Sequence, residues 1–152
     1  MSRYRWFVLV AMTTLLVCVP LARAETSVIS VANDEIAGIE AKGFELPPYE
    51  IVALDRWNSA GNTVILPSAQ QYVIVLWNHY YNEEQLRKVA AHEAAHLLMA
   101  SLGLSQSEGT ANQFVACFGS EGAKHWATQV ENTRVSPQSC ALLRSELGPN
   151  ED

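Results

Sequence analysis

The sequence predicts an α+β domain in which one helix and a small sheet of about three strands precede three or four helices. Two observations support this prediction. Apolar runs rich in β-branched and aromatic residues gather between residues 49 and 77, whereas helical periodicity with capping residues extends from residue 82 to residue 146. Strands that are grouped before helices are typical of an α+β domain rather than of an alternating α/β domain.

The first expected helix begins at Asn33, which is a good N-cap, and continues through Ile36 and Ile39 until Gly43 can end it. Three strands follow, and a turn-forming segment over residues 58–62 separates the first two. The expected strands cover residues 49–55, 63–66 and 72–77. The third run is almost continuously apolar, so we expect this strand to be buried on both faces of the sheet.

The best-capped helix is expected in the second half of the chain. Asn82 is its N-cap, Gln85 stands three residues later as in a capping box, and Gly103 suits the position just after an end near Leu102. Further helices are expected from Ser105 or Ser107 to Phe118, over residues 124–132, and from Ser136 to Glu146 with Pro137 at the first helical position.

Residues 1–24 are expected to be a cleaved secretory signal peptide. Arg3 and Arg5 precede an uncharged apolar run over residues 7–19, and Ala22-Arg23-Ala24 places small residues where a signal peptidase reads them. This apolar run is too short to span a membrane, which takes about 20 residues, so no stable membrane insertion is expected after cleavage. A single domain over residues 25–152 is then left.

The charge of the chain excludes two classes of partner. The whole chain has 10 lysines and arginines and 16 aspartates and glutamates, and three of the arginines belong to the expected signal peptide. The remaining domain is therefore strongly acidic. Such a surface repels nucleic acid and anionic lipid, so we exclude both as main partners. Solubility is the more common reason for an acidic surface than attraction of a basic substrate.

The cysteines fit an oxidising compartment. Removal of the signal peptide takes away Cys18 and leaves Cys117 and Cys140, for which a disulfide is expected. On the chain-entropy model such a bond stabilises the fold by about 3 kcal/mol. A role as metal ligands is disfavoured, because neither cysteine has a Cys-x-x-Cys partner. Together with the expected signal peptide, this predicts an exported bacterial protein that is periplasmic or secreted.

The segment His92-Glu93-Ala94-Ala95-His96 combines two histidines and a glutamate inside the best-capped helix. Residues four apart lie on one face of a helix, so both imidazole rings can converge on one metal ion. Glu93 projects about 100° around the helix from His92, which leaves it within reach of a water molecule beside that ion. The spacing is typical of a zinc site with a glutamate as general base.

The expected chemistry divides between the histidines and the glutamate. Two neutral imidazoles would hold a zinc ion, which lowers the pKa of its water to about 7. Glu93 would take a proton as the water attacks a carbonyl group, and would pass it to the leaving amine. The alternative is a solvated helix face that carries two histidines by chance. The apolar neighbours favour the metal site, because a buried histidine pair needs partners for its ring nitrogens.

A third protein ligand is needed. The chain has Met99 and Leu102 where the extended metzincin motif requires glycine and histidine, and no aspartate follows His96 before Asp152. The candidates that remain are Glu108, Glu121, His125 and Glu131.

Glu108 is the preferred third ligand. It follows Gly103 in the first turns of the next helix, so a helix–turn–helix could fold it back over the metal face. A competing role is structural: Ser105 and Glu108 have the spacing of a capping box, with the glutamate at the third helical position. One carboxylate cannot serve both roles.

The residues from Glu108 to Ala116 resemble the Glu-x-x-Ala-(Asn/Asp)-x-Phe helix of gluzincin metallopeptidases, particularly the ImmA/IrrE-type group. The resemblance covers residues 82–116. It implies that Glu108 is the third zinc ligand and that Asn112 orients a histidine. In such families a strand edge before the first motif helix lines the substrate, and residues 72–77 could be near that edge.

Two departures from that group limit what the resemblance implies. The expected signal peptide places this protein outside the cytoplasm, so the regulatory substrates of ImmA/IrrE-type proteins do not transfer. The chain also has no recognisable substrate-binding domain. An oxyanion-stabilising group is still required, and His125 is our candidate, with Tyr80, Tyr81 and Arg134 also available.

These observations predict a minimal zincin-like domain, in which the first helix and the small sheet pack on the motif helix and two to three further helices. The expected function is hydrolysis of peptide bonds in a peptide or protein substrate, with one zinc ion and Glu93 as base. The alternative is a non-catalytic zinc-binding or protein-binding module of the envelope that keeps the motif helix. A regulatory or assembly factor with slow, specific cleavage is a third hypothesis. The intact Glu93 disfavours the non-catalytic module, because a structural metal site needs no base.

Overall fold

The computed structural model describes residues 28–56, 60–66, 71–80 and 82–149. The expected signal peptide, part of the turn expected at residues 58–62, and Tyr81 lie outside the described residues. Within them the chain is an α+β domain, as predicted. The elements after the first helix are β1 (Tyr49–Leu54), β2 (Gly61–Leu66), β3 (Gln71–Trp77), α2 (Glu83–Ser101), α3 (Glu108–Phe118), α4 (Glu121–His125), the π-helical segment η1 (Trp126–Val130) and α5 (Pro137–Leu147).

The first described helix covers residues 28–40 and already contains Asn33, so the prediction of Asn33 as N-cap is wrong. The buried stripe explains the earlier start, because Val28 and Ala32 extend the helical spacing of Ile36 and Ile39 towards the N-terminus. The predicted end is confirmed, since Gly43 has a φ of +87°, a left-handed conformation that favours glycine.

The sheet has the strand order β1-β3-β2, with β1 parallel and β2 antiparallel to β3. Three consecutive residues of β3, Ile74, Val75 and Leu76, are buried, so this strand is covered on both faces as predicted. Its central place corrects the expectation that residues 72–77 lie near a substrate-lining edge. The edge strand that packs against α2 is β2.

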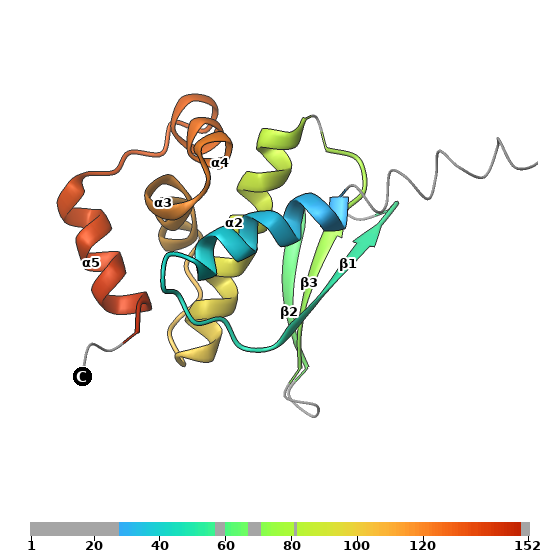
Figure 1. Cartoon of the computed structure of the whole chain (residues 1–152), viewed down its shortest axis with the longest axis horizontal. Helices are drawn as coiled ribbons and strands as arrows, with labels where there is room; N and C mark the ends of the chain where they lie inside the picture. Colours follow the sequence, from blue (N-terminus) through green and yellow to red (C-terminus); the bar gives the residue numbers. More distant parts are fainter. Residues whose placement is uncertain (1–27, 57–59, 67–70, 81, 150–152) are drawn as a thin grey trace, which may run out of the picture.

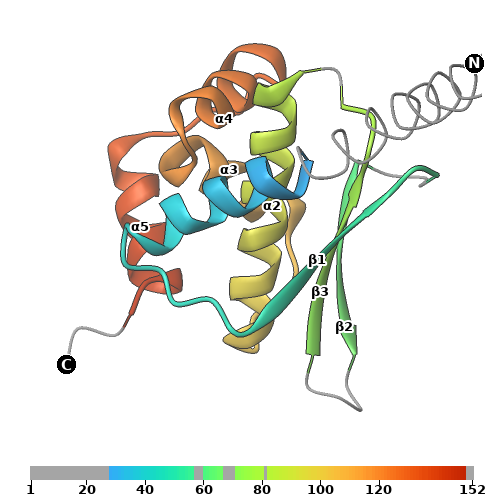
Figure 2. The same cartoon turned by 45° about the vertical axis from the view of Figure 1, so that its right-hand side comes forward.

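Helix α2 is the centre of the domain. Residues 89–99 are all buried, because β2, β3, α3 and α4 pack around the helix. In Figures 1 and 2 the sheet lies on one side of α2 and α5 lies on the other. Four alanines in this segment, Ala90, Ala91, Ala94 and Ala95, have no exposed surface and let the neighbouring elements approach closely.

Both predicted ends of α2 are confirmed. The Asn82 side chain accepts a hydrogen bond from the Gln85 main-chain nitrogen at 2.9 Å. At the other end Gly103 has a φ of +69°, and its N–H donates to the Ala100 carbonyl at 3.1 Å while the Leu104 N–H donates to Met99 at 2.8 Å. This pair of bonds is a Schellman motif, which ends the helix and turns the chain back along it.

The C-terminal helices differ from the prediction at one place. The segment expected to be helical over residues 124–132 begins three residues earlier, at Glu121, because Ser120 caps α4 through the Ala123 main-chain nitrogen at 3.3 Å. Its second half continues as η1. Helix α5 begins as predicted after Ser136, whose side chain forms a capping box with Ser139.

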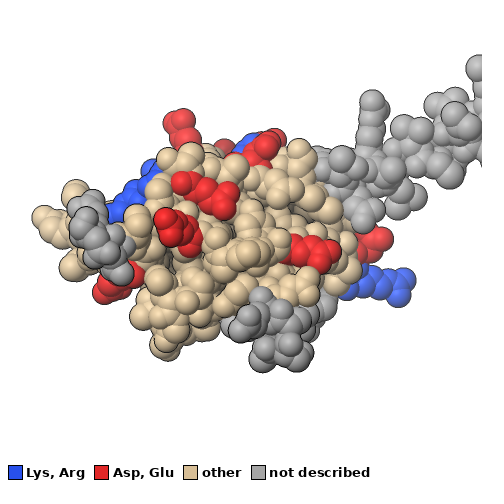
Figure 3. All heavy atoms as spheres, turned by 60° about the horizontal axis from the view of Figure 1, so that its bottom comes forward, with Lys and Arg blue, Asp and Glu red and all other residues tan. Residues whose placement is uncertain are grey.

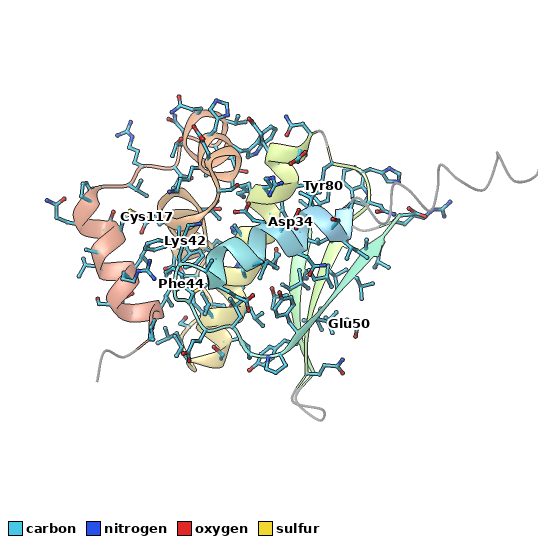
Figure 4. The ribbon with its side chains drawn as sticks, in the orientation of Figure 1. Asp34, Lys42, Phe44, Glu50, Tyr80 and Cys117 are labelled. Carbon is cyan, nitrogen blue, oxygen red and sulfur yellow. A yellow bond between two sulfur atoms is a disulfide. The ribbon has the colours of Figure 1, made fainter. Side chains whose placement is uncertain are left out.

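The predicted disulfide between Cys117 and Cys140 is present and joins α3 to α5, with the two Cα atoms 5.5 Å apart. The same junction is filled by aromatic rings. Phe44 contacts Phe118 with ring centroids 4.9 Å apart, and the Arg144 guanidinium lies 4.1 Å from the Phe44 ring centroid. Figure 4 shows Cys117 and Phe44 in this region between α5 and the rest of the domain.

The described residues bear on two predictions, the absence of stable membrane insertion and the acidic surface. Within this part of the chain, no helix has both the length and the apolar character needed to cross a membrane. On the face shown in Figure 3, acidic side chains stand at several separate positions and basic side chains stand singly.

Candidate metal centre

His92 and His96 lie one turn apart on α2, and each has only 8 % of its surface exposed. Their Nε2 atoms are 3.1 Å apart, so the two rings converge on one point as the spacing predicts. The alternative of a solvated helix face is wrong, because the face that carries these histidines is covered by other elements.

Glu108 is brought to the histidines by the turn at Gly103. Its Oε2 lies 3.0 Å from Nε2 of His92, and its Oε1 lies 3.2 Å from Nε2 of His96. The competing role as a capping-box residue is wrong. Ser107 is the N-cap of α3, with its hydroxyl accepting from the Thr110 main-chain nitrogen at 3.2 Å, and Glu108 is the first helical residue rather than the third.

The distances among these three side chains fit a bound metal ion. In a tetrahedral site with bonds of about 2.0–2.1 Å, two ligand atoms stand about 3.3 Å apart. The two Nε2 atoms and the Glu108 carboxylate show separations of 3.0–3.2 Å. His92, His96 and Glu108 thus form a group that could hold a metal ion, and among the described residues no other such group of three is found.

The other candidates for the third ligand have different places. Glu121 lies in the first turn of α4. Glu131 forms an ion pair with Lys88 at 3.0 Å, and His125 pairs through Nδ1 with Glu84 at 3.0 Å.

Burial keeps His92 neutral. Removal from water lowers the pKa of His92 to about 4, with repulsion from Lys88 and His96 in the same direction and the Glu108 carboxylate opposing it. The ring is therefore unprotonated at neutral pH, and one nitrogen can offer its lone pair to a metal ion.

Glu93 has a partner that the sequence did not indicate. The Thr63 hydroxyl, on β2, donates to Oε2 of Glu93 at 2.8 Å and lies 3.0 Å from the main-chain oxygen of the same residue. Glu93 is 5 % exposed. Burial raises the pKa of this carboxyl group above its ordinary value, and the hydrogen bond from Thr63 opposes that rise.

Gly61 lets β2 approach Glu93. A Cβ atom at this position would stand 2.5 Å from Cγ1 of Val89 and 2.8 Å from Oε1 of Glu93, which are separations that real side chains do not adopt. The absence of a side chain at residue 61 is therefore a condition for the contact between Thr63 and Glu93.

Two hollows flank the candidate metal ligands. The first, of about 420 Å³, lies over His92, Glu93 and His96 between β2 on one side and Gln106 and Glu108 on the other. We call it the β2 hollow. The second, of about 390 Å³, is lined on its other side by Lys88, Asn112 and Glu131, and we call it the Lys88 hollow. His92, Glu93 and Glu108 line both, so two of the three candidate ligands and the candidate base stand between the two hollows.

Asn112 lies one turn after Glu108 on α3 and lines the Lys88 hollow together with His92. Its Oδ1 atom and the Nδ1 atom of His92 are both buried without a hydrogen-bond partner. The structure does not join these two atoms, so the orienting role of Asn112 stays a prediction.

The residues considered for the oxyanion have other surroundings. His125 is paired with Glu84 on the surface and is absent from the lining of either hollow. The Tyr80 hydroxyl donates to the Ala60 carbonyl and accepts from the Trp77 N–H, and burial raises its pKa. Figure 4 shows Tyr80 beside the sheet. Its hydroxyl group is used in these two hydrogen bonds to main-chain groups.

Three residues of the site carry no sequence signal of their own. Thr63 and Gly61 stand on a strand that precedes the motif by some 30 residues, and Gln106 lies in an irregular loop. The side-chain amide of Gln106 is 2.9 Å from Nδ1 of His96. Only the tertiary packing of β2 and of this loop on α2 places these side chains beside the motif.

Comparisons with known proteins give no family for this chain. No protein-family model matches it, and neither a curated protein nor a solved structure does.

Proposed function

We propose that this protein is an exported, zinc-dependent metallopeptidase. One observation carries the proposal: the Nε2 atoms of His92 and His96 converge with the Glu108 carboxylate within 3.2 Å, and Glu93 lines the same two hollows. Two imidazoles and one carboxylate are the donor set of hydrolytic zinc sites that keep a coordination position open. When bound, zinc lowers the pKa of water to about 7 and polarises a carbonyl group.

Glu93 acts as the general base in this proposal. It is buried beside the ligands but does not belong to the group that converges on the metal position. Its carboxylate takes the proton of the attacking water and delivers it to the amine that leaves when the peptide C–N bond breaks. The raised pKa of Glu93 suits the first step, because it makes the carboxylate a stronger base towards the attacking water.

Lys88 takes the role of oxyanion stabiliser in place of His125. It lines the Lys88 hollow with His92 and Glu93, and its side chain is 12 % exposed. The ion pair with Glu131 at 3.0 Å holds the ammonium group at the wall of this hollow. A positive charge that is fixed there would stabilise the negative charge on the carbonyl oxygen under attack.

A peptide is the substrate class that the surroundings favour. Strand β2 is an edge strand of the sheet and contributes Gly61, Asn62 and Thr63 to the β2 hollow. An extended peptide can pair with such an edge through its main chain, which would carry the bond to be cleaved past Glu93.

Export is the second part of the proposal. The disulfide between Cys117 and Cys140 is compatible with an oxidising compartment. We propose that residues 1–24 are the cleaved signal peptide and that the mature domain is periplasmic or secreted. N-terminal sequencing of protein from the envelope fraction should begin at Glu25. A protein that keeps Met1 in the cytoplasm would contradict export.

The substitution Glu93→Gln tests the peptidase. The variant should bind zinc as the wild type does and should lose cleavage of a quenched fluorescent peptide library by a factor of about 100 or more. Glu121→Gln, which removes a carboxylate at the start of α4, is the matched control and should cleave normally. Equal cleavage by Glu93→Gln and wild type would sink the proposal. Zinc binding with no cleavage by either protein would favour a non-catalytic zinc module.

A further inference from the structure

We propose that two copies of this chain pair through strand β1 and form a dimer with one continuous sheet. The inference goes beyond the proposed function and does not depend on a metal ion. Among the described residues, β1 pairs with β3 alone, so no strand of this part of the chain lies beside its outer edge. In Figure 2 β1 passes in front of the other two strands.

The outer edge of β1 lacks the features that keep exposed strands from pairing. Proteins protect such edges with lysine, proline or a bulge. The segment Tyr49–Leu54 contains no lysine or proline, its pairing with β3 is continuous, and Glu50 is its only charged residue. The chain has 16 acidic and 10 basic residues. Two like-charged copies meet with least repulsion where charged side chains are few, and β1 is such a place.

The main-chain groups of β1 alternate in direction along the strand. The Leu54 carbonyl accepts a hydrogen bond from the Asn78 N–H at 2.9 Å, so this residue directs its main-chain groups towards β3. In a parallel ladder every second residue does the same, which includes the residues two and four positions earlier. Tyr49, Ile51 and Ala53 therefore direct their N–H and C=O groups to the outer edge.

One antiparallel register pairs all of these outward groups. A two-fold axis through Ile51 places this residue opposite Ile51 of the second copy and places Tyr49 opposite Ala53. Each outward N–H then meets a carbonyl group of the other β1. An axis one residue later would set Tyr49 opposite Asp55, which lies beyond the strand, and an axis one residue earlier would set two copies of Glu50 opposite each other. The edge is thus complementary to a second copy of itself, which favours this partner over a different protein.

The two faces of the sheet keep their roles in this dimer. Tyr49, Ile51 and Ala53 pack against the core, so Glu50 and Val52 project from the opposite face. In the register centred on Ile51, Glu50 of one copy stands opposite Val52 of the other. Strand β2 lies at both outer edges of the joined sheet, so each copy keeps the edge that lines its candidate metal centre.

Val52→Glu tests the proposal, because it places a glutamate opposite Glu50 of the second copy. By analytical ultracentrifugation the purified wild type should have twice the mass of one chain. The dissociation constant of the dimer should rise about 10-fold or more in Val52→Glu, since two like-charge pairs then oppose each other. Addition of Glu50→Lys turns these into pairs of opposite charge and should restore the dimer. Val64→Glu is the matched control, because Val64 lies on the same face but on β2, and it should dimerise as the wild type does.

Amide hydrogen exchange of the wild type is a second measurement that needs no variant. The N–H groups of Ile51 and Ala53 should exchange more slowly at high protein concentration, where the dimer prevails, than at low concentration. A wild-type monomer at high concentration would overturn the inference and leave the edge of β1 to another partner. Equal effects of Val52→Glu and Val64→Glu, no recovery with Glu50→Lys, or fast exchange of both N–H groups in the dimer would overturn pairing through β1 in this register.

Discussion

The Thr63 hydroxyl on strand β2 donates a hydrogen bond of 2.8 Å to the carboxylate of Glu93 on helix α2. This bond favours the ionised carboxylate and opposes the effect of burial on the pKa of Glu93. The contact joins the edge of the sheet to the candidate base, so it connects the fold directly to the proposed chemistry.

Thr63→Val should raise the pKa of Glu93 further. A base must be ionised, so the acidic limb of the activity profile should move to higher pH, and kcat/KM should fall about 10- to 100-fold at neutral pH. Thr63→Ser keeps the hydroxyl and should retain the wild-type profile. Zinc affinity should not change in either variant. A Thr63→Val profile that overlies the wild type would show that the bond does not tune Glu93.

Thr63→Val should also change the way in which the free energy of unfolding depends on pH. A carboxyl group whose folded pKa is raised stabilises the fold below its unfolded pKa, near the ordinary value of 4.5, and loses that contribution as pH rises through the folded pKa. Metal-free Thr63→Val should therefore lose more stability than wild type between pH 4 and pH 8. Urea unfolding at several pH values measures this difference.

Gly61→Ala should disturb the site by steric overlap. Its Cβ would collide with Val89 and Glu93, so we expect a loss of about 1–3 kcal/mol in the free energy of unfolding and a large loss of cleavage. Gly38→Ala is the matched control, because the residue is in a helix and a Cβ there would meet no atom within 4 Å beyond its chain neighbours and the backbone of its own helix. That variant should be unchanged or stabilised by about 1 kcal/mol. Equal stability of the two variants would contradict the close packing of β2 on α2.

Lys88→Met keeps the length of the side chain and removes the charge in the Lys88 hollow. If Lys88 stabilises the oxyanion, kcat should fall about 100-fold or more while zinc stays bound. Glu131→Gln removes the partner of Lys88 but leaves the ammonium group, so its kcat should fall much less. Unchanged kcat in Lys88→Met would assign the oxyanion to another group.

The disulfide between α3 and α5 should contribute stability without touching the site. Replacement of Cys117 and Cys140 by alanine should lower the free energy of unfolding by about 3 kcal/mol, which corresponds to roughly 10 °C in Tm. Zinc content should stay at the wild-type value, because α5 does not contribute a metal ligand. A variant with unchanged Tm would show that the bond does not stabilise this fold.

Local patterns predicted much of the fold. The ends of α2 at Asn82 and Gly103 and the start of α5 at Ser136 were predictable because caps act within a few residues. The prediction failed at Asn33, where a buried stripe continues past a residue that is also a good cap. It also failed to identify the strand at the edge beside α2, which is β2 and not residues 72–77, because sequence order does not reveal that the third strand lies in the middle.

The candidate site also contains some residues that local sequence patterns predict and others that they do not. The convergence of His92 and His96 follows from helix geometry, and the place of Glu108 depends on one tight turn. Thr63, Gly61 and Gln106 reach the site only through tertiary packing, so no local pattern could indicate them. For Glu108 the local pattern was also ambiguous, since two serines could cap α3 and only the use of Ser107 releases the carboxylate from a capping box.

The zinc content per chain of the purified protein is the first measurement to make on the proposed site of His92, His96 and Glu108. Wild type, Glu93→Gln, His92→Ala and Glu108→Ala are compared after equilibration with zinc and removal of the excess. We expect one zinc ion in wild type and in Glu93→Gln, and none in His92→Ala or Glu108→Ala. A wild-type protein that holds no zinc, or a Glu108→Ala variant that holds it as firmly as wild type, would rule out a zinc site formed by these three side chains.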